Sequence, residues 1–555
     1  MSDIQTWTLV FIVITFGIYI TIAWRSRVKE TAGFYVAGQG IPTVANGAAV
    51  AADWMSAASF ISMAGLIAFL GSDGSIYLMG WTGGYVLLAL LLAPYLRKWG
   101  KFTVPEFVGD RYSEAVRIIA ALAAIIVSFT YVVGQMNGGG IVFSRFLGLD
   151  ITGGVIVAAI IIFAYAVLGG MKGITWTQVA QYTVLIIAYL IPAVAVAQQM
   201  TGIPIPQVSF GQILGELDAL SQQFGLDAFT DPFSARPQID VFFVTMSLMV
   251  GTAGLPHVII RFYTTKSVRG ARWSAFWALF FISLLYTTAP AVGAFTKLNL
   301  LQGVQGVSAD ELPSWVVNWQ QTGLVSVAEG ASTIETVSND ATSGADLIVN
   351  NDILVLASPE IAGLPAPIIG LVAAGGMAAA LSTAAGLLLV ISSSFSHDLF
   401  FRVVKRKTTD AQQLLAGRVA MGLAVLIAIY FGINPPAFVA QVVAFAFGLA
   451  ASTFFPILLL GIFWKRANGI GAVCGMVAGL IFTASYMIYT LEVFGTSAND
   501  HVLGISPEGI GAIGAVVNLV ITVVVSLATR PPSEHVQEMV EEIRYPAARV
   551  TSGER

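Results

Sequence analysis

Long runs of apolar residues recur along almost the whole chain, each about as long as a membrane-crossing helix. A helix needs about 20 such residues to cross the apolar core of a bilayer. Thirteen stretches meet this requirement, at 7–24, 42–70, 75–96, 115–144, 151–169, 174–200, 239–264, 273–296, 363–396, 413–433, 436–463, 468–493 and 509–529. The pattern predicts an all-α integral membrane protein with about thirteen transmembrane helices.

The composition points the same way and excludes several classes of protein. Apolar residues make up 56% of the 555 residues and charged residues only 10%, whereas a soluble surface carries about 25–35% charged residues. The net charge of −4 provides no basic surplus for nucleic acid, and no GxxxxGK[ST] sequence indicates a nucleotide-driven pump. One cysteine, Cys474, and four histidines provide neither a disulfide framework nor a Cys/His metal site.

Lysine and arginine residues are unevenly distributed between the two sets of loops. If the N-terminus lies outside, all 27 of them except Arg145, Arg236 and Lys297 fall in or beside loops on the cytoplasmic side. Cytoplasmic loops carry the positive excess. We therefore expect the protein to lie in the plasma (inner) membrane with its N-terminus outside, its C-terminus in the cytoplasm, and its long polar loops, 201–238 and 297–362, outside.

Two of the predicted spans contain small and polar residues at mid-membrane depth. The span at 42–70 includes AAVAADWMSAASFISMAG, and the span at 239–264 includes MSLMVGTAGLPHVIIRF. They stand five spans apart, as corresponding helices of two inverted five-helix repeats would. Such paired broken helices indicate a transporter binding site, although glycine and alanine also allow close helix packing.

Five local motifs occur in a fixed order over about residues 35–410. They are AADWMSAASF at 51–60, KFTVPEFVGDRY at 101–112, YAVLGGMKGITWTQVAQ at 165–181, GTAGLPHVIIRF at 251–262 and AAALSTAAGLLLVISSSFSHDLF at 378–400. Together they resemble the solute:sodium symporter family, and within it the cation/acetate symporter branch. The hydropathy pattern extends this resemblance to nearly the whole chain.

The resemblance implies a LeuT-type fold of five-plus-five inverted repeats, with one extra helix before the core and two after it. The expected divisions are an N-terminal helix and cytoplasmic link at 1–34, a first repeat at 35–200, an extracellular loop at 201–238, a second repeat at 239–463 that includes the loop 297–362, two C-terminal helices at 464–529 and a cytoplasmic tail at 530–555.

A sodium ion prefers several oxygen ligands in a site shielded from lipid. Ser382 and Thr383 lie side by side in one predicted span, and their side chains lean over the preceding turn towards the carbonyl of Ala379. An unwound stretch of span 42–70 would free the carbonyls of Ala52 and Met55. The family's sodium site is built from the positions that match these five residues. Taken without the resemblance, the two hydroxyls are more simply explained by hydrogen bonds to their own helix.

Asp53 is the only carboxylate that these spans place in the bilayer core, where an acidic residue is costly and therefore indicates function. It could support sodium, couple a proton, or hold the broken helix open. The structural alternative is that Asp53 caps a half-helix or pairs with another buried polar group.

The candidate substrate site also lies at the two breaks. A half-helix N-terminus suits a carboxylate, and residues with small side chains after the first break, Ala58 among them, are too poor in polar groups to bind a sugar. These features favour a small monocarboxylate. The candidate substrate-binding residues are Asp53, Ser56, Ser59, Gln135, Gly251, Thr252 and Gly254.

Three polar residues near these motifs receive other roles. His257 and Arg261 stand four residues apart towards the cytoplasmic end of their span, which favours a structural pair or a phosphate-facing anchor over a proton relay. Gln178 stands where some relatives carry an acid, which argues against an additional cation site there.

Further residues are expected to shape the cytoplasmic side. Glu106 and Arg111 are predicted to fix the geometry of the loop at 97–114, and Gly169 and Gly170 to form a tight turn between the fifth and sixth spans.

These observations predict a secondary active transporter, and not an enzyme, that imports an acetate-like monocarboxylate with sodium by alternating access around a midplane site. The expected partners are the carboxylate, sodium and the lipid membrane, without nucleic acid, and no cofactor is expected besides the co-transported sodium. The sequence leaves open an accessory small membrane subunit, proton-coupled symport of a monocarboxylate or an amino acid, and a solute sensor that retains the fold.

Overall fold

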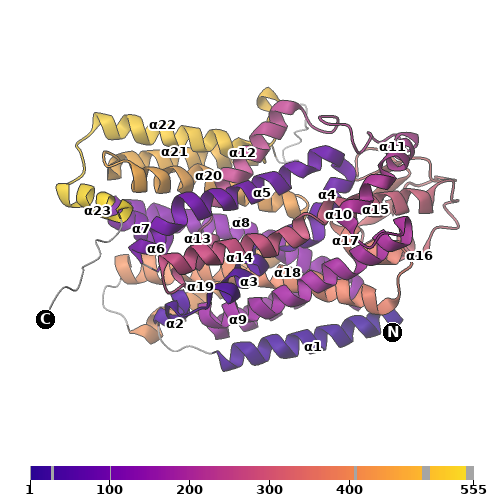
Figure 1. Ribbon diagram of the computed structural model, residues 1–555, viewed down its shortest axis with the longest axis horizontal. Helices are drawn as coiled ribbons and strands as arrows, with labels where there is room; N and C mark the ends of the chain where they lie inside the picture. Colours follow the sequence, from indigo (N-terminus) through magenta and orange to yellow (C-terminus); the bar gives the residue numbers. More distant parts are fainter. Residues whose placement is uncertain (1, 27–30, 101, 405–408, 491–500, 546–555) are drawn as a thin grey trace.

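The computed structural model describes residues 2–26, 31–100, 102–404, 409–490 and 501–545. Most of these residues are helical, and the long helices run roughly along one axis of the molecule (Figure 1). The helices of the bundle are α1 (Asp3–Arg25), α3 (Thr43–Trp54), α4 (Met63–Leu70), α5 (Ser75–Leu87), α6 (Ala93–Trp99), α8 (Glu114–Leu147), α9 (Ile151–Thr201), α12 (Gln238–Gly254), α13 (Pro256–Tyr263), α14 (Val268–Tyr286), α15 (Ala289–Val304), α18 (Ala366–Ser393), α19 (Asp410–Ile433), α20 (Val439–Phe463), α21 (Gly469–Tyr489) and α22 (Ile510–Ala528).

Shorter elements connect these helices or follow them. The short helices are α2 (Thr31–Val36), α7 (Val104–Arg111), α10 (Pro206–Ser209), α11 (Leu214–Gln223), α16 (Ser314–Gln320), α17 (Leu354–Ile361) and α23 (Glu534–Arg544). Strands β1 (Val325–Val327), β2 (Val337–Ser338) and β3 (Leu347–Val349) form a small sheet with β3 in the middle, antiparallel to β1 and parallel to β2.

Most of the predicted membrane spans are confirmed. Eleven helical stretches among the described residues are long and apolar enough to cross a membrane, one of which, Ala58–Trp99, includes parts of two predicted spans. The shorter apolar helix Ile151–Ala164 corresponds to the predicted span at 151–169. The apolar stretch of α18 is entirely buried, whereas most of that of α1 is exposed, so α18 is central and α1 is peripheral.

Both predicted helix breaks are present. The first follows α3: Met55 leaves the helical conformation with φ −76° and ψ 65°, and a π-helical turn at Ala58–Ser62 leads into α4. The second separates α12 from α13 at Leu255, which is extended with φ −70° and ψ 117°. Pro256 explains this break because proline disfavours helical backbone in the residue before it.

Two other local features differ in how well the sequence predicted them. The turn between the fifth and sixth spans is confirmed, because Gly170 within α9 has φ +51°, a conformation that favours glycine. The predicted span at 273–296 is not one helix: α14 ends at Tyr286 and α15 begins at Ala289. Pro290 lies in the first turn of α15, where it starts a helix more readily than it continues one.

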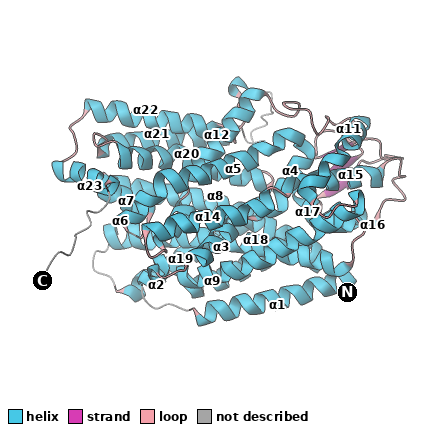
Figure 2. Ribbon diagram, viewed as in Figure 1, coloured by secondary structure: helices cyan, strands magenta, loops and turns pink. Residues whose placement is uncertain are grey.

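The two ends of the bundle are built differently. Helices α10, α11, α16 and α17 and the small sheet gather at the end where the chain begins, while α23 lies at the opposite end (Figures 1 and 2). The two long polar segments predicted to share a side of the membrane therefore do lie at one end of the molecule.

Candidate functional site

The candidate ion site lies where the end of α3 meets the central helix α18. The Ser382 hydroxyl donates to the Ala52 carbonyl at 2.7 Å and lies 2.9 Å from the Ala379 carbonyl. The Thr383 hydroxyl donates to the Asp53 carbonyl at 2.7 Å and lies 3.4 Å from the same Ala379 oxygen. All five residues are buried. The structure thus gathers two hydroxyls and three main-chain carbonyls from two helices.

Met55 differs from the other four residues of the predicted sodium site. It is the residue at which α3 leaves the helical conformation, but the carbonyl that Thr383 contacts belongs to Asp53. The sequence prediction considered only the side chain of Asp53, and its main-chain oxygen was missed.

The Asp53 side chain makes a buried ion pair rather than pointing into open space. Arg261 Nε lies 3.1 Å from Asp53 Oδ2, and Gln178 Nε2 donates to Oδ1 at 3.1 Å. A Cβ at position 386 of α18 would lie 2.4 Å from Oδ1, so Gly386 makes room for the carboxylate. This geometry agrees with the structural alternative for Asp53, in which its carboxylate pairs with another buried polar group.

The position of Arg261 is therefore a correction to the sequence-based prediction, and the contacts of Gln178 are an addition to it. Arg261 was expected to form a pair with His257 or to face lipid phosphates, but its side chain is fully buried in α13 and bonded to Asp53. The His257 ring instead packs edge-on against Tyr131 at 5.3 Å. The Gln178 amide donates both to Asp53 and to the Ser382 carbonyl, at 2.7 Å, and so links α9 to α3 and α18.

Three predicted substrate-site side chains line the break after α3. The backbone N–H of Ala57, which the break frees, donates to Gln135 Oε1 of α8 at 2.9 Å. Ser59 Oγ lies 3.0 Å from the Tyr286 hydroxyl, and Ser56, three residues earlier in the chain, is buried. The amide nitrogen of Gln135 is buried and has no hydrogen-bond partner among the described residues.

The predicted residues of the second break contact neighbouring helices closely. A Cβ at Gly251 would lie 2.2 Å from the Phe447 carbonyl of α20, and one at Gly254 would lie 2.7 Å from the Ala450 carbonyl. The geometry therefore gives these two glycines a packing role. The Thr252 hydroxyl, by contrast, is buried and unpartnered among the described residues.

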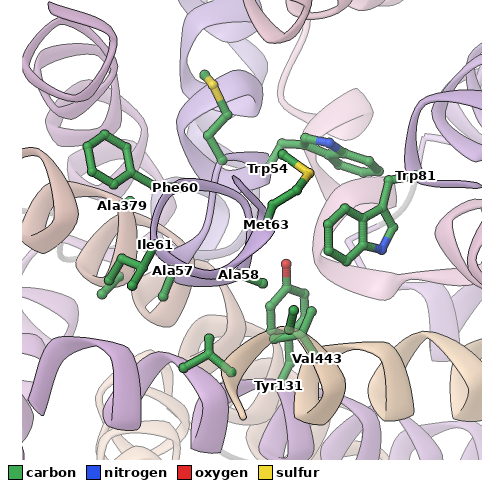
Figure 3. Packing of buried hydrophobic residues seen from close by; sticks show 14 of the residues in the cluster. Trp54, Ala57, Ala58, Phe60, Ile61, Met63, Trp81, Tyr131, Ala379 and Val443 are labelled. Atoms are coloured by element: carbon green, nitrogen blue, oxygen red, sulfur yellow. The ribbon is translucent and has the colours of Figure 1, made fainter. Parts of the chain in front are cut away.

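Aromatic side chains gather beside the first break, and the sequence prediction did not include them. Trp54, Trp81 and Tyr131 all pack against Phe447, with ring centroids 6.4, 5.7 and 5.7 Å away, respectively. Figure 3 shows these three side chains near Ala58. The only signal in the sequence was their placement in or near spans that carry the polar motifs.

The expected role of Arg111 at the opposite end from the N-terminus is confirmed. Its guanidinium donates to the carbonyls of Gly461, Trp464 and Ala467 at 2.9 to 3.1 Å and so ties α7 to the end of α20. Glu106 accepts from the backbone N–H of Phe102 at 3.1 Å, which fixes the preceding loop.

Comparisons with known proteins agree with this arrangement. A model of the sodium:solute symporter family matches residues 34–309 and 315–479. The chain belongs to this family. An uncharacterised symporter of Cupriavidus necator is 35% identical, over 96% of this chain and 93% of the relative. The uncharacterised symporter YwcA of Bacillus subtilis is 30% identical, over 86% of this chain and 85% of the relative.

The structural comparison shows the fold of this symporter. A sodium-coupled sialic acid symporter, solved in a substrate-bound outward-open state, aligns with a TM-score of 0.72 at 16% identity, over 96% of this chain and 99% of that one. The fold is the LeuT-type inverted repeat in a membrane protein, which has eleven candidate spans among the described residues. The protein is a transporter and not an enzyme, and sodium is its co-transported ion.

Proposed function

We propose that this symporter uses the sodium gradient to import a small, acetate-like monocarboxylate by alternating access. The observation that carries the proposal is the cluster of buried oxygens between α3 and α18, which joins a broken helix to the most buried helix of the bundle. We assign sodium to Ala52, Met55, Ala379, Ser382 and Thr383, with the carbonyl of Asp53 as a further ligand.

The chemistry of these oxygens suits sodium. Hard cations prefer oxygen ligands, and a cation of about this size lies about 2.3–2.6 Å from each of them. The hydroxyls of Ser382 and Thr383 already lie 2.7 to 3.4 Å from carbonyls. When the hydroxyl protons rotate away from these carbonyls, the hydroxyl oxygens and the carbonyl oxygens can bind the same ion. This requires only a small separation of α3 and α18.

The substrate assignment rests on the size and polarity of the residues around the breaks. Ala58 presents only a methyl group, while the aromatic rings of Trp81 and Tyr131 add apolar surface. The unpartnered donors Gln135 Nε2 and Thr252 Oγ1 would each be satisfied by a carboxylate, which only accepts hydrogen bonds. We assign substrate binding to Ser56, Ser59, Gln135 and Thr252, leave Gly251 and Gly254 the packing role that the geometry gives them, and give Asp53 a positioning role.

The placement of the long loops and of the basic residues supports an orientation for the protein. The N-terminus and the segments 201–238 and 297–362 share one end of the bundle (Figure 1), and few of the lysine and arginine residues of the sequence fall in these segments. We place this end outside and the opposite end in the cytoplasm. Residues 35–200 and 239–463 would then be the two repeats, with 1–34, 464–529 and 530–555 as additions.

Uptake into proteoliposomes tests the proposed function. Labelled acetate, propionate, pyruvate and proline are compared with an inward sodium gradient, with an inward proton gradient, and with neither. We expect concentrative uptake of at least one monocarboxylate with the sodium gradient only. Accumulation of proline alone, or uptake driven by the proton gradient without sodium, would overturn the assignment.

A further inference from the structure

A buried ion pair joins the two half-helices that lie on the cytoplasmic side of the two breaks. Asp53 stands one residue before the end of α3, and Arg261 stands in α13, 208 residues later. Both side chains are almost completely inaccessible to solvent, at 2% and 0% exposure. Charges buried this far from water interact more strongly than surface charges, and the loss of one partner leaves the other uncompensated.

The pair shares a residue with the proposed sodium site. Asp53 presents its carbonyl to Thr383 and its carboxylate to Arg261, so one residue serves both groups. Gln178 adds a second connection, because its amide nitrogen donates to the Asp53 carboxylate and to the Ser382 carbonyl. A shift of α13 therefore acts on the residue whose oxygen lies at the ion site.

Arg261 is also anchored through its backbone. Asn46 of α3 donates to the Arg261 carbonyl at 3.2 Å and to Ser274 of α14 at 2.7 Å, while Thr264 donates to the Asn46 side-chain oxygen at 2.9 Å. These bonds hold α13 against α3 independently of the guanidinium. The charge of Arg261 can then be removed without removing every contact between the two half-helices.

The guanidinium itself is incompletely bonded. Nε contacts Asp53, and Nη1 lies 3.3 Å from both the Thr175 hydroxyl and the Met171 sulfur. Nη2 is buried with no hydrogen-bond partner among the described residues. An arginine that served only as a strut would be expected to use most of its five N–H groups, as Arg111 does with three carbonyls.

We infer that Asp53 and Arg261 form a charge clasp in which the guanidinium and sodium compete for one carboxylate. The inference deepens the proposed function, since it assumes that sodium binds beside Asp53. Sodium bound there attracts the Asp53 carboxylate and repels the Arg261 guanidinium, which weakens the hold on α13. Arg261 is thus a positioning residue that transmits sodium binding from one broken span to the other.

The clasp predicts effects of opposite sign for its two halves. Asp53→Asn leaves an uncompensated positive charge beside the sodium site, so sodium affinity should fall about tenfold or more. Arg261→Gln leaves an uncompensated negative charge, so sodium affinity should rise about tenfold while solute turnover falls. The double variant has neither charge and should return to within about threefold of the original affinity.

The test measures binding of radioactive sodium to purified protein without solute, with thermal unfolding as the check on folding. Arg145→Gln is the matched control, because Arg145, in the last turn of α8, also pairs with a mostly buried carboxylate, Glu360 at 2.9 Å. Glu360 belongs to α17, which lies at the end of the bundle where the chain begins (Figure 1). The control variant should lower stability without changing sodium affinity. A purely structural role for Arg261 would make Arg261→Gln resemble this control.

The outcomes separate the clasp from the sodium site itself. Ser382→Ala and Thr383→Ala are measured alongside, and if both leave sodium binding unchanged, the proposed site is wrong. If Ser382→Ala or Thr383→Ala weakens sodium binding, the proposed sodium site stands. The clasp is then overturned by either of two results. In the first, Asp53→Asn and Arg261→Gln shift sodium affinity in the same direction; in the second, the double variant is no nearer to the original affinity than Asp53→Asn. If Asp53→Asn does not fold, the sodium affinity of Arg261→Gln decides: a rise supports the clasp, and an unchanged or lowered affinity overturns it.

Discussion

Replacing Ser382 with alanine should weaken sodium activation about tenfold. The hydroxyl is one of five oxygens in the cluster. It lies 2.7 Å from the Ala52 carbonyl oxygen and 2.9 Å from the Ala379 carbonyl oxygen, which are two of the three shortest distances in the cluster. A bond between a hydroxyl dipole and a charged group contributes about 1.5–3 kcal/mol. The sodium-free protein also loses about 1 kcal/mol when the hydroxyl no longer donates to the Ala52 carbonyl, which offsets part of the effect. The difference of about 0.5–2 kcal/mol corresponds to roughly a two- to thirtyfold change.

Ser393→Ala is the matched control for this variant. Ser393 lies on α18, is equally buried, and donates to the Val390 carbonyl of its own helix at 3.1 Å. Initial rates of solute uptake into proteoliposomes are measured against sodium concentration for both variants. The control should keep the original sodium dependence, and both proteins should unfold at similar temperatures in sodium-free buffer. The reasoning is refuted if Ser382→Ala and Thr383→Ala both keep the original half-activating sodium concentration.

Three further predictions concern stability and topology. Gly170→Ala should lower the unfolding temperature, because the residue has φ +51° and its Cβ would lie 2.6 Å from the Phe34 ring; unchanged thermal unfolding would contradict this. Burial raises the pKa of the Asp352 carboxyl, outside the spans, to about 6, so the folded protein holds this proton more tightly than the unfolded chain, whose pKa is about 3.9. Stability should therefore fall as pH rises from about 4 to about 6, and Asp352→Asn should remove part of that fall in thermal unfolding scans. A cysteine at Thr333, in a chain whose Cys474 is replaced by serine, should react with an impermeant thiol reagent from outside intact cells; reaction only after permeabilisation would reverse the orientation.

The features that local rules govern were predictable from the sequence. A run of apolar residues predicts the length of a span, and Pro256 predicts the helix break before it. Both predictions depend only on residues that are close together in the chain. The contacts of Ser382 and Thr383 with the Ala379 carbonyl follow from helix geometry alone. Their contacts with α3, 330 residues away in the chain, came only with the family resemblance.

The partner of Asp53 could not be predicted in this way. Arg261 stands near the end of the predicted span 239–264, so the sequence places it with the basic residues at the cytoplasmic ends of spans. Its burial results from the packing of α13 against α3, which the sequence does not reveal. One signal was present: the two broken spans carry opposite charges, and a charge in the membrane interior is expected to have a partner. Gly251 and Gly254 show the reverse difficulty, since the small residues that mark a break also serve the approach of α20.

Charge balance at the site connects the ion to the proposed solute. The ligands proposed for sodium are all neutral oxygens, and the ionised side chains bonded beside them, Asp53 and Arg261, cancel each other. Sodium then adds one positive charge to a buried region, which is costly unless a counter-ion is close. A monocarboxylate bound at the adjoining break would provide that counter-ion, whereas a neutral sugar or a zwitterion would not restore neutrality. The same balance gives each ligand a reason to bind more tightly in the presence of the other, because either alone leaves a net charge in the membrane interior.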